Sequence, residues 1–263
     1  VTNDLYADVL KFENCSQITL SGLTVGHVKA LKEYECEGAV LKFDGSREIS
    51  VKNCNLYGCG AEGIYADNTE GITVDNSKIY SCTYASIWLT GRSQATINNS
   101  IFCDSKHDSG FLRVDNSLIS CNGCEINNIT TDDWAGFIDT FDSNESPSKI
   151  SFLNCNFTNN TFNCVTNDDG NKVITFTNCT FRDNSGNWNH YTVTYSGSKV
   201  PTTSITPQKI YTKASESLYI GETVKLPVSF WPANVTDTSV SWSSSNTKVA
   251  TVDQNGVVRG VGK

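Results

Sequence analysis

The sequence contains no methionine, only five prolines and only three histidines in 263 residues. No window approaches the ~20 consecutive apolar residues that a membrane-spanning helix needs, so no membrane span is expected. Residues 1–8 lack the basic and then apolar pattern of a secretory signal peptide. Because an initiator methionine is also missing, we expect this chain to be part of a longer one.

Basic residues are in short supply as well. The chain has 20 Lys and Arg against 28 Asp and Glu, which gives a net charge of −8 and a pI near 4.9. A nucleic-acid-binding surface needs clustered Lys and Arg to neutralise phosphates. The composition therefore excludes nucleic acid as an expected partner.

Charge and cysteine are unevenly spread along the chain. Residues 1–199 hold 24 acids against 14 Lys and Arg and all 11 cysteines, whereas residues 200–263 hold four acids against six Lys and Arg and no cysteine. A stretch of small residues, Gly and Pro at 196–204 has the composition of a linker. We therefore predict two domains, 1–199 and 200–263.

The first part of the chain repeats one pattern seven times. Apolar and polar residues alternate in each copy, and this period of two is typical of a strand with one buried face. The copies start 31, 23, 23, 24, 31 and 24 residues apart, at 18–25, 49–56, 72–79, 95–102, 119–126, 150–157 and 174–181. A second short strand is expected before most copies, at 9–12, 40–43, 63–66, 86–89, 111–114 and 137–140.

One column of the repeat holds only asparagine or glycine: Gly22, Asn53, Asn76, Asn99, Gly123, Asn154 and Asn178. Both residue types tolerate left-handed backbone, so the column predicts a bend at the same place in every repeat. The Asn amides are also placed to bond from one repeat to the next. Short strands that recur in this way, with no helical segment between them, predict a β-solenoid of about seven or eight stacked coils. The extra residues at 28–38 and 142–149 are expected to be lateral loops, the first long enough for a short helix.

These coils of Ile-x-Val-x-Asn-Cys/Ser-x-Ile/Phe with their asparagine column resemble the right-handed parallel β-helix of the pectate-lyase-like superfamily, over roughly residues 8–195. The resemblance implies an all-β fold. It leaves the function open, because that superfamily contains lyases, hydrolases, epimerases and non-catalytic adhesins.

The second part alternates in the manner of short antiparallel strands, expected at 217–226, 228–232, 240–246, 249–253 and 255–259. The run Trp242-Ser-Ser-Ser-Asn246, then Val249-Ala-Thr-Val-Asp253 and Gly256-Val-Val, is similar to the bacterial immunoglobulin-like group 2 family. The resemblance implies a small β-sandwich that lacks its last strand after Lys263. It also implies a bacterial, extracellular chain, because such modules act mainly as spacers and adhesion stalks on surface proteins.

The cysteines leave two alternatives open. Stacked coils place Cys59 beside Cys82, and Cys124, Cys155 and Cys179 in one column, at about 4.8 Å per strand. Disulfides are possible at that separation, but parallel Cβ vectors make the required dihedral angle hard to reach. We favour free thiols that pack as small core residues.

The short strands predict two outward columns on one face of the solenoid. The first column reads Lys11, Lys42, Tyr65, Trp88 and Arg113, with Asp139 next, and the second reads Glu13, Asp44, Asp67, Thr90 and Asp115, with Asp169 further along. Aromatic rings offer flat apolar surfaces for sugars, and the flanking basic residues offer hydrogen-bond donors. The candidate ligand-binding residues are thus Lys42, Tyr65, Trp88, Arg113, Asp67 and Asp115. An ordinary solvated strand surface with Lys–Asp pairs is the alternative.

Catalysis would need more than this face offers. A β-elimination requires a base, for which Arg113 is the candidate, and Ca²⁺ that acidifies the proton beside a uronate carboxyl. Asp115 and Asp139 are the candidate Ca²⁺ ligands. The Arg-rich motif of the lyases and the Gly-His-Gly context of the related hydrolases are both absent.

Three functions remain. The favoured one is a bacterial surface module, extracellular and non-catalytic, that binds a polysaccharide or cell-surface glycan or acts in adhesion. The second is a Ca²⁺-dependent polysaccharide lyase or related carbohydrate-active enzyme. The third is a structural spacer.

Overall fold

The computed structural model describes residues 6–27, 37–58, 61–142, 147–167, 172–199, 209–213, 217–231 and 238–262. The chain divides into two compact units, residues 1–202 and residues 203–263. Every regular element among the described residues is a strand. No helix long and apolar enough to cross a membrane occurs in these ranges.

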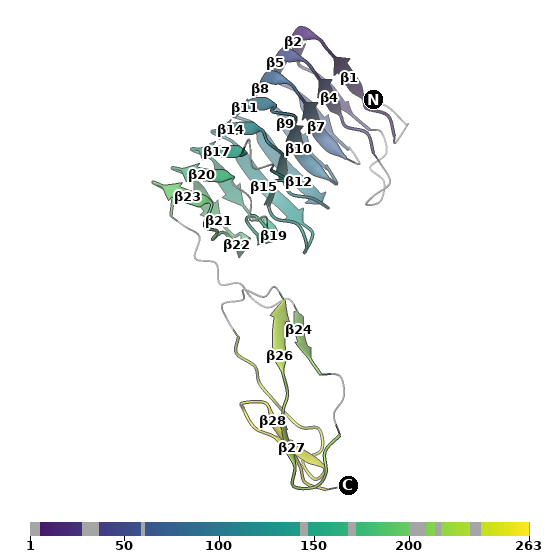
Figure 1. Ribbon diagram of the computed structural model, residues 1–263, viewed down its shortest axis with the longest axis vertical. Helices are drawn as coiled ribbons and strands as arrows, with labels where there is room; N and C mark the ends of the chain where they lie inside the picture. The colour runs from purple at the N-terminus through teal and green to yellow at the C-terminus, as the bar shows by residue number, and fades with distance from the viewer. Residues whose placement is uncertain are drawn as a thin grey trace. The chain divides into compact units, whose positions relative to one another are not determined.

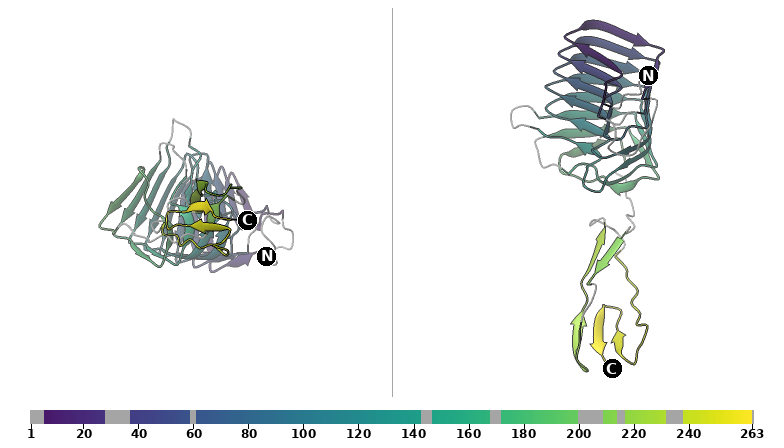
Figure 2. Two further views of the ribbon diagram at one scale, coloured as in Figure 1. Left: turned by 90° about the horizontal axis from the view of Figure 1, so that it is seen from below. Right: turned by 90° about the vertical axis from the view of Figure 1, so that its right-hand side faces the viewer.

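Unit 1 is a stack of coils whose strands form three parallel sheets (Figures 1 and 2). The predicted parallel β-helix is therefore confirmed. The first sheet has six strands in the order β1 (Leu10–Glu13), β4 (Leu41–Asp44), β7 (Glu62–Asp67), β10 (Ala85–Thr90), β13 (Leu112–Val114) and β16 (Ile138–Asp139). Each lies close to a short strand that the repeat predicted.

The second sheet has eight strands, so the number of coils also agrees with the prediction. Their order is β2 (Ser16–Ser21), β5 (Arg47–Lys52), β8 (Glu70–Asp75), β11 (Gln94–Asn98), β14 (Leu118–Asn122), β17 (Lys149–Leu153), β20 (Val173–Thr177) and β23 (Val193–Ser196). Its outward face carries one hydroxyl residue per coil, in register as Thr19, Ser50, Thr73, Thr96, Ser120, Ser151, Thr175 and Thr194. β-Branched and hydroxyl side chains suit such a surface because they pack and bond across neighbouring strands.

The third sheet has nine strands and completes each coil. They are β3 (Thr24–Gly26), β6 (Asn55–Tyr57), β9 (Lys78–Tyr80), β12 (Ile101–His107), β15 (Glu125–Thr131), β18 (Asn156–Thr158), β21 (Thr180–Arg182), β19 (Thr161–Cys164) and β22 (Ser185–Asn187). The repeat segments thus bend between the second and third sheets. The lateral-loop residues 28–36 and 143–146, including the possible short helix, lie outside the described residues.

The bend has the backbone that its asparagines predicted. All seven residues of that column have a left-handed φ, between 47° at Asn99 and 67° at Gly22. The coil-to-coil amide bonds expected of the Asn side chains are not formed among the described residues. Side chains of the following column, at Cys54, Ser77 and Ser100, make coil-to-coil bonds instead. Cys54 N donates to Ser77 Oγ at 3.0 Å, and Ser77 N donates to Ser100 Oγ at 3.1 Å. A side chain that sits just inside the bend is closer to the free backbone amides than the outward Asn is.

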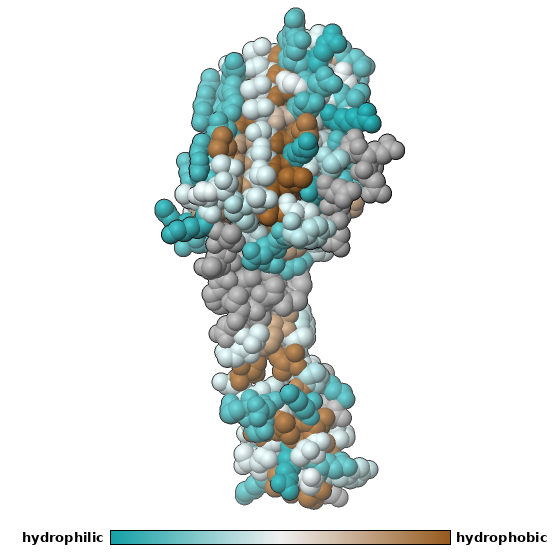
Figure 3. Space-filling view, turned by 60° about the vertical axis from the view of Figure 1, so that its left-hand side comes forward, coloured by the Kyte–Doolittle hydropathy of each residue, from teal (hydrophilic) through white to brown (hydrophobic). Residues whose placement is uncertain are grey.

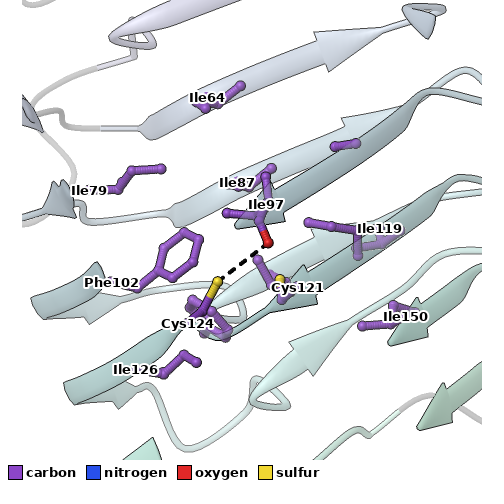
Figure 4. Packing of buried hydrophobic residues seen from close by; sticks show 14 of the residues in the cluster. Ile64, Ile79, Ile87, Ile97, Phe102, Ile119, Cys121, Cys124, Ile126 and Ile150 are labelled. Atoms are coloured by element: carbon purple, nitrogen blue, oxygen red, sulfur yellow. Dashed lines mark hydrogen bonds between the residues drawn. The ribbon is translucent and has the colours of Figure 1, made fainter. Parts of the chain in front are cut away.

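The core of unit 1 lies inside the stacked coils (Figure 4). Isoleucines such as Ile64, Ile87 and Ile97 fill the earlier coils, and aromatic rings that include Phe157, Phe176 and Trp188 fill the last ones. Cys124 is part of this core, and its Sγ lies 3.5 Å from the carbonyl oxygen of Ile97. All nine described cysteines are free thiols, and seven of them are buried, in agreement with the interpretation as core thiols. Cys15 and Cys164 are only partly buried, and Cys36 and Cys59 are outside the described residues.

Unit 2 is a small antiparallel arrangement. β24 (Lys209–Thr212) pairs with β26 (Val228–Trp231), and β25 (Thr223–Lys225), β28 (Val257–Gly260) and β27 (Ala250–Val252) form a three-stranded sheet. The prediction of a strand at 240–246 is wrong. These residues alternate in character but form no ladder with a neighbouring strand. None of the described apolar side chains of this unit is fully buried, and brown apolar atoms are open on its surface in Figure 3.

Candidate functional site

The two outward columns of the first sheet have the register that the sequence predicted. Lys11, Lys42, Tyr65, Trp88, Arg113 and Asp139 are successive cross-strand partners, as are Glu13, Asp44, Asp67 and Thr90. Asp115 follows directly after β13, and Asp169 is outside the described residues. The alternation sets these directions, because Ala66 and Leu89, next to the outward residues, are buried in the core.

Outward side chains of the first sheet form a continuous series of ring and cation contacts. Lys42 Nζ lies 5.2 Å from the centre of the Tyr65 ring, which meets the Trp88 ring edge to face at 5.1 Å. The guanidinium carbon of Arg113 lies 4.5 Å from the Trp88 ring and 4.4 Å from the Phe141 ring. We call these five residues, Lys42, Tyr65, Trp88, Arg113 and Phe141, the ring ladder. Each contact is of a type that stabilises by cation–π or aromatic attraction.

Asp115 holds the middle of the ring ladder in place. Its Oδ2 accepts hydrogen bonds from Trp88 Nε1 at 2.9 Å and from Arg113 Nε at 3.1 Å. Its Oδ1 accepts the backbone N–H of Phe141 at 2.8 Å, and the residue is only 8% exposed. The remaining side of the Arg113 guanidinium donates to the hydroxyl of Tyr84. One buried carboxylate therefore fixes three members of the ring ladder.

The other cation of the ring ladder is also paired. Lys42 Nζ lies 3.5 Å from Asp8 Oδ2. Asp44 and Asp67, which border the ring ladder, have no cation partner within 4 Å in the described part of the chain. The face is therefore rich in aromatic surface and carries more acid than base.

Asp139, in register with Arg113, is almost completely buried at 3% exposure. Its Oδ1 accepts the Gly136 N–H at 2.9 Å and its Oδ2 accepts the Ser109 hydroxyl at 3.1 Å. Burial raises the pKa of this carboxyl above its usual value. The described residues contain no group of three or more His, Cys, Asp or Glu placed to hold a metal ion. A Ca²⁺ ion at Asp115 and Asp139 would have to displace protein donors from both carboxylates, and it stays a prediction.

Three residues of this face were not found from the sequence. Tyr84 and Phe141 lie just outside the predicted strands, and the Tyr84 ring is 5.6 Å from that of Trp88. Glu62, at the start of β7, is 5% exposed, and burial raises its pKa to about 7, against the opposing effect of Lys42 and Arg113. The only signal for Glu62 in the sequence was its place just before a predicted short strand. No sequence signal marked the rings of Tyr84 and Phe141, because both lie at corners of the coils.

The histidines are not part of this face. His27 and His107 are buried, and the Nε2 atoms lie 3.0 Å from Ala7 O and 3.2 Å from Ser86 Oγ. Burial lowers the pKa of His107 to about 3, so its ring is neutral in the folded protein at ordinary pH. His190 Nδ1 lies 2.8 Å from the Thr192 hydroxyl at the last coil. These contacts agree with packing roles.

Residues 38–204 match the family described as the right-handed beta helix region, and residues 200–263 match the bacterial Ig-like domain (group 2). A 45-residue stretch is 53% identical to a 3-O-alpha-D-galactosyl-alpha-L-arabinofuranosidase of Bifidobacterium longum subsp. longum. That stretch is 17% of this chain and only 4% of the relative.

Among solved structures, the chain is similar to the receptor-binding domain of the Siphovirus 9NA tailspike, with 13% identity over 78% of this chain and 49% of that one, at a TM-score of 0.26. It is also similar to PfbA, a surface adhesin of Streptococcus pneumoniae, with 11% identity over 98% of this chain and 67% of that one, at a TM-score of 0.24. The chain thus spans about half of the first of these structures.

Proposed function

This chain belongs to the right-handed β-helix family, and we propose that its β-helix is a glycan-binding module of a bacterial cell-surface protein, with the ring ladder as its binding face. The observation that carries the proposal is the run of aromatic and cationic side chains over successive coils, bordered by Asp44 and Asp67. Phe141 is 64% exposed and Tyr65 and Trp88 are partly exposed. A large aromatic surface of this kind is seldom left open without a partner.

The chemistry of the face suits a carbohydrate. The C–H faces of a pyranose pack on aromatic rings, and its hydroxyls pair with carboxylates and with phenol groups such as that of Tyr84. The relative from B. longum is named as a glycosidase, which agrees with a role in carbohydrate recognition, although the shared stretch is a small part of it. The match of residues 200–263 to the bacterial Ig-like domain (group 2) supports a bacterial source and is in keeping with display outside the cell.

The geometry favours binding over elimination chemistry. A lyase base must be free to take a proton from the sugar, but Arg113 Nε donates to Asp115 and its Nη1 donates to the Tyr84 hydroxyl, so its guanidinium is already engaged by the protein. Glu62 is the residue that keeps an enzyme possible, because a buried carboxyl with a pKa of about 7 can donate a proton near neutral pH. A carbohydrate-active enzyme built on Glu62 is therefore the second candidate.

The test is retention of the full chain in affinity gels that contain neutral or acidic polysaccharides. Tyr65→Ala and Phe141→Ala remove rings at the two ends of the aromatic series, and both should weaken retention about tenfold, since stacked rings contribute most to such sites. The matched control is Tyr80→Ala on the third sheet, whose ring carries Lys78 Nζ at 4.5 Å.

Equal retention of wild type and both variants would contradict the proposed face. Absence of retention on every polysaccharide would favour the spacer. If the wild type releases reducing ends from a polysaccharide and Glu62→Gln does not, the second candidate, a carbohydrate-active enzyme that uses Glu62, would be established.

A further inference from the structure

Resting on the proposed function, we infer that the ring ladder takes an uncharged glycan chain that runs along the stack of coils, and that it rejects chains bearing uronate or sulfate groups. The inference depends on which charges of the face are already compensated and on the spacing of the rings. Both are properties of the described residues of the first sheet.

The two cations of the ring ladder are already held by protein carboxylates, and Lys11, the third cation of this column, is paired with Glu13. Arg113 is held by Asp115, and its guanidinium plane is covered by the Trp88 ring on one side and contacts Phe141 as well. Lys42 is held by Asp8 at 3.5 Å. A uronate would have to break these pairs, which would leave a largely buried Asp115 without its partner.

The remaining charges are negative. Asp44 and Asp67 are cross-strand partners, two positions beyond Lys42 and Tyr65 on their strands, and neither has a cation partner within 4 Å in the described ranges. Their effect reaches the rings. Burial is the largest cause that raises the pKa of the Tyr65 hydroxyl. Nearby carboxylates raise it further, namely those of Asp67, Glu62, Asp44 and Asp115. A negative charge placed at this hydroxyl is therefore opposed from several sides.

The direction of the chain follows from the coils. Tyr65, Trp88 and Arg113 are in register on adjacent strands, so successive members of the ring ladder advance by about 4.8 Å each. This advance is close to the length of one pyranose in an extended chain. A glycan parallel to the stack can thus place one sugar over each coil, whereas a chain across the strands meets the row of Asp44 and Asp67.

The experiment compares one polysaccharide in three chemical forms. A neutral polymer that the full chain retains is oxidised at its primary alcohols to uronates, and part of the oxidised polymer is then converted to the uncharged amide. Oxidation should weaken retention at least about tenfold at low salt, because like charges are brought together, and added salt should reduce the loss. The amide form should recover retention.

Two acid-removing double variants separate charge from shape. Asp44→Asn with Asp67→Asn should raise the retention of the oxidised polymer relative to the native one. Glu48→Gln with Glu70→Gln removes the same charge from the second sheet in the same two coils and should leave that ratio unchanged.

Oxidised polymer retained as well as the native form would overturn the selectivity while leaving glycan binding intact. An amide form that stays unretained would overturn it too, because the loss would then come from the altered C6 group. Retention of acidic polymers only would overturn this inference and leave the proposed function intact, whereas failure to retain any polymer, neutral or acidic, would overturn both.

Discussion

Asp115 Oδ2 lies 2.9 Å from Trp88 Nε1 and so joins the end of β13 to β10 through a single buried carboxylate oxygen. The same oxygen also accepts from Arg113, which makes Asp115 the residue on which the order of the ring ladder depends.

Replacing this carboxylate should destabilise unit 1. Asp115→Asn removes the negative charge but keeps the size, so Arg113 would be left as a largely buried, unpaired cation. We expect a loss of about 3 kcal/mol in the free energy of unfolding, as is typical when one partner of such a pair is removed. Urea unfolding monitored by tryptophan fluorescence measures it. Asp44→Asn, which breaks no pair, is the control and should change stability by less than about 0.5 kcal/mol; equal losses in both variants would contradict the role of Asp115.

Affinity should depend on glycan length. Tyr65, Trp88, Arg113 and Phe141 accompany four successive strands, β7, β10, β13 and β16, which span about 14 Å at about 4.8 Å per strand. Affinity should therefore rise with each sugar up to about four and then level off. Calorimetric titration with an oligosaccharide series of the retained polymer checks this. A plateau already at one or two sugars would indicate a single pocket instead of a row along the stack.

Much of the fold was predictable because it depends on local rules repeated many times. Asn53 and Asn76 mark the bend of successive coils, and the spacing between them fixes which outward residues become neighbours. The cross-strand series from Lys11 through Lys42 and Tyr65 to Trp88 follows this spacing, whereas the steps to Arg113 and Asp139 follow only from the alignment of the short strands themselves.

The candidate site was only partly predictable. Tyr84 and Phe141 come from corners, and Glu62 from the first position of β7, where the repeat places little constraint on the path of the chain, so their contacts depend on tertiary packing. The pairing of Arg113 with Asp115, two positions along the chain, was also not foreseen. A strand with strict alternation points both side chains outward, but only the structure shows that they bond each other and Trp88.

The asparagine column makes a prediction about the backbone. Asn76 has a φ of 48° and an exposed side chain with no bond to the next coil. Asn76→Ala should therefore cost about 1 kcal/mol, because a Cβ-bearing residue other than Asn or Asp disfavours this conformation. Asn76→Gly should be neutral or slightly stabilising, since glycine adopts it freely. Thermal unfolding of both variants measures the difference, and equal effects would show that the Asn side chain itself contributes.

Stability should fall as the pH rises through the titration of Glu62. The pKa of this carboxyl is raised from 4.5 to about 7 by burial in the folded chain, near Lys42, Asp8 and Arg113. Between these two values the folded state binds more protons than the unfolded state, so the contribution of Glu62 is most favourable below about pH 4.5 and is lost above about pH 7. The ionised side chain then costs the folded state up to about 3 kcal/mol relative to its protonated form.

Glu62→Gln isolates this effect from the other titrating groups. The lowered pKa of His107 acts in the opposite direction, because folding then weakens as the pH falls below about 6.5, and Asp139 adds to the effect of Glu62. Both groups titrate in the wild type and in the variant, so they cancel when the two free energies of unfolding are subtracted. The variant should gain on the wild type by up to about 3 kcal/mol between about pH 5 and pH 8 in urea titrations, with the exposed Glu48→Gln as the matched control. If the difference between the two free energies of unfolding stays constant over this range, Glu62 ionises as readily in the folded protein as in water. That result would also contradict the proposal of Glu62 as a proton donor.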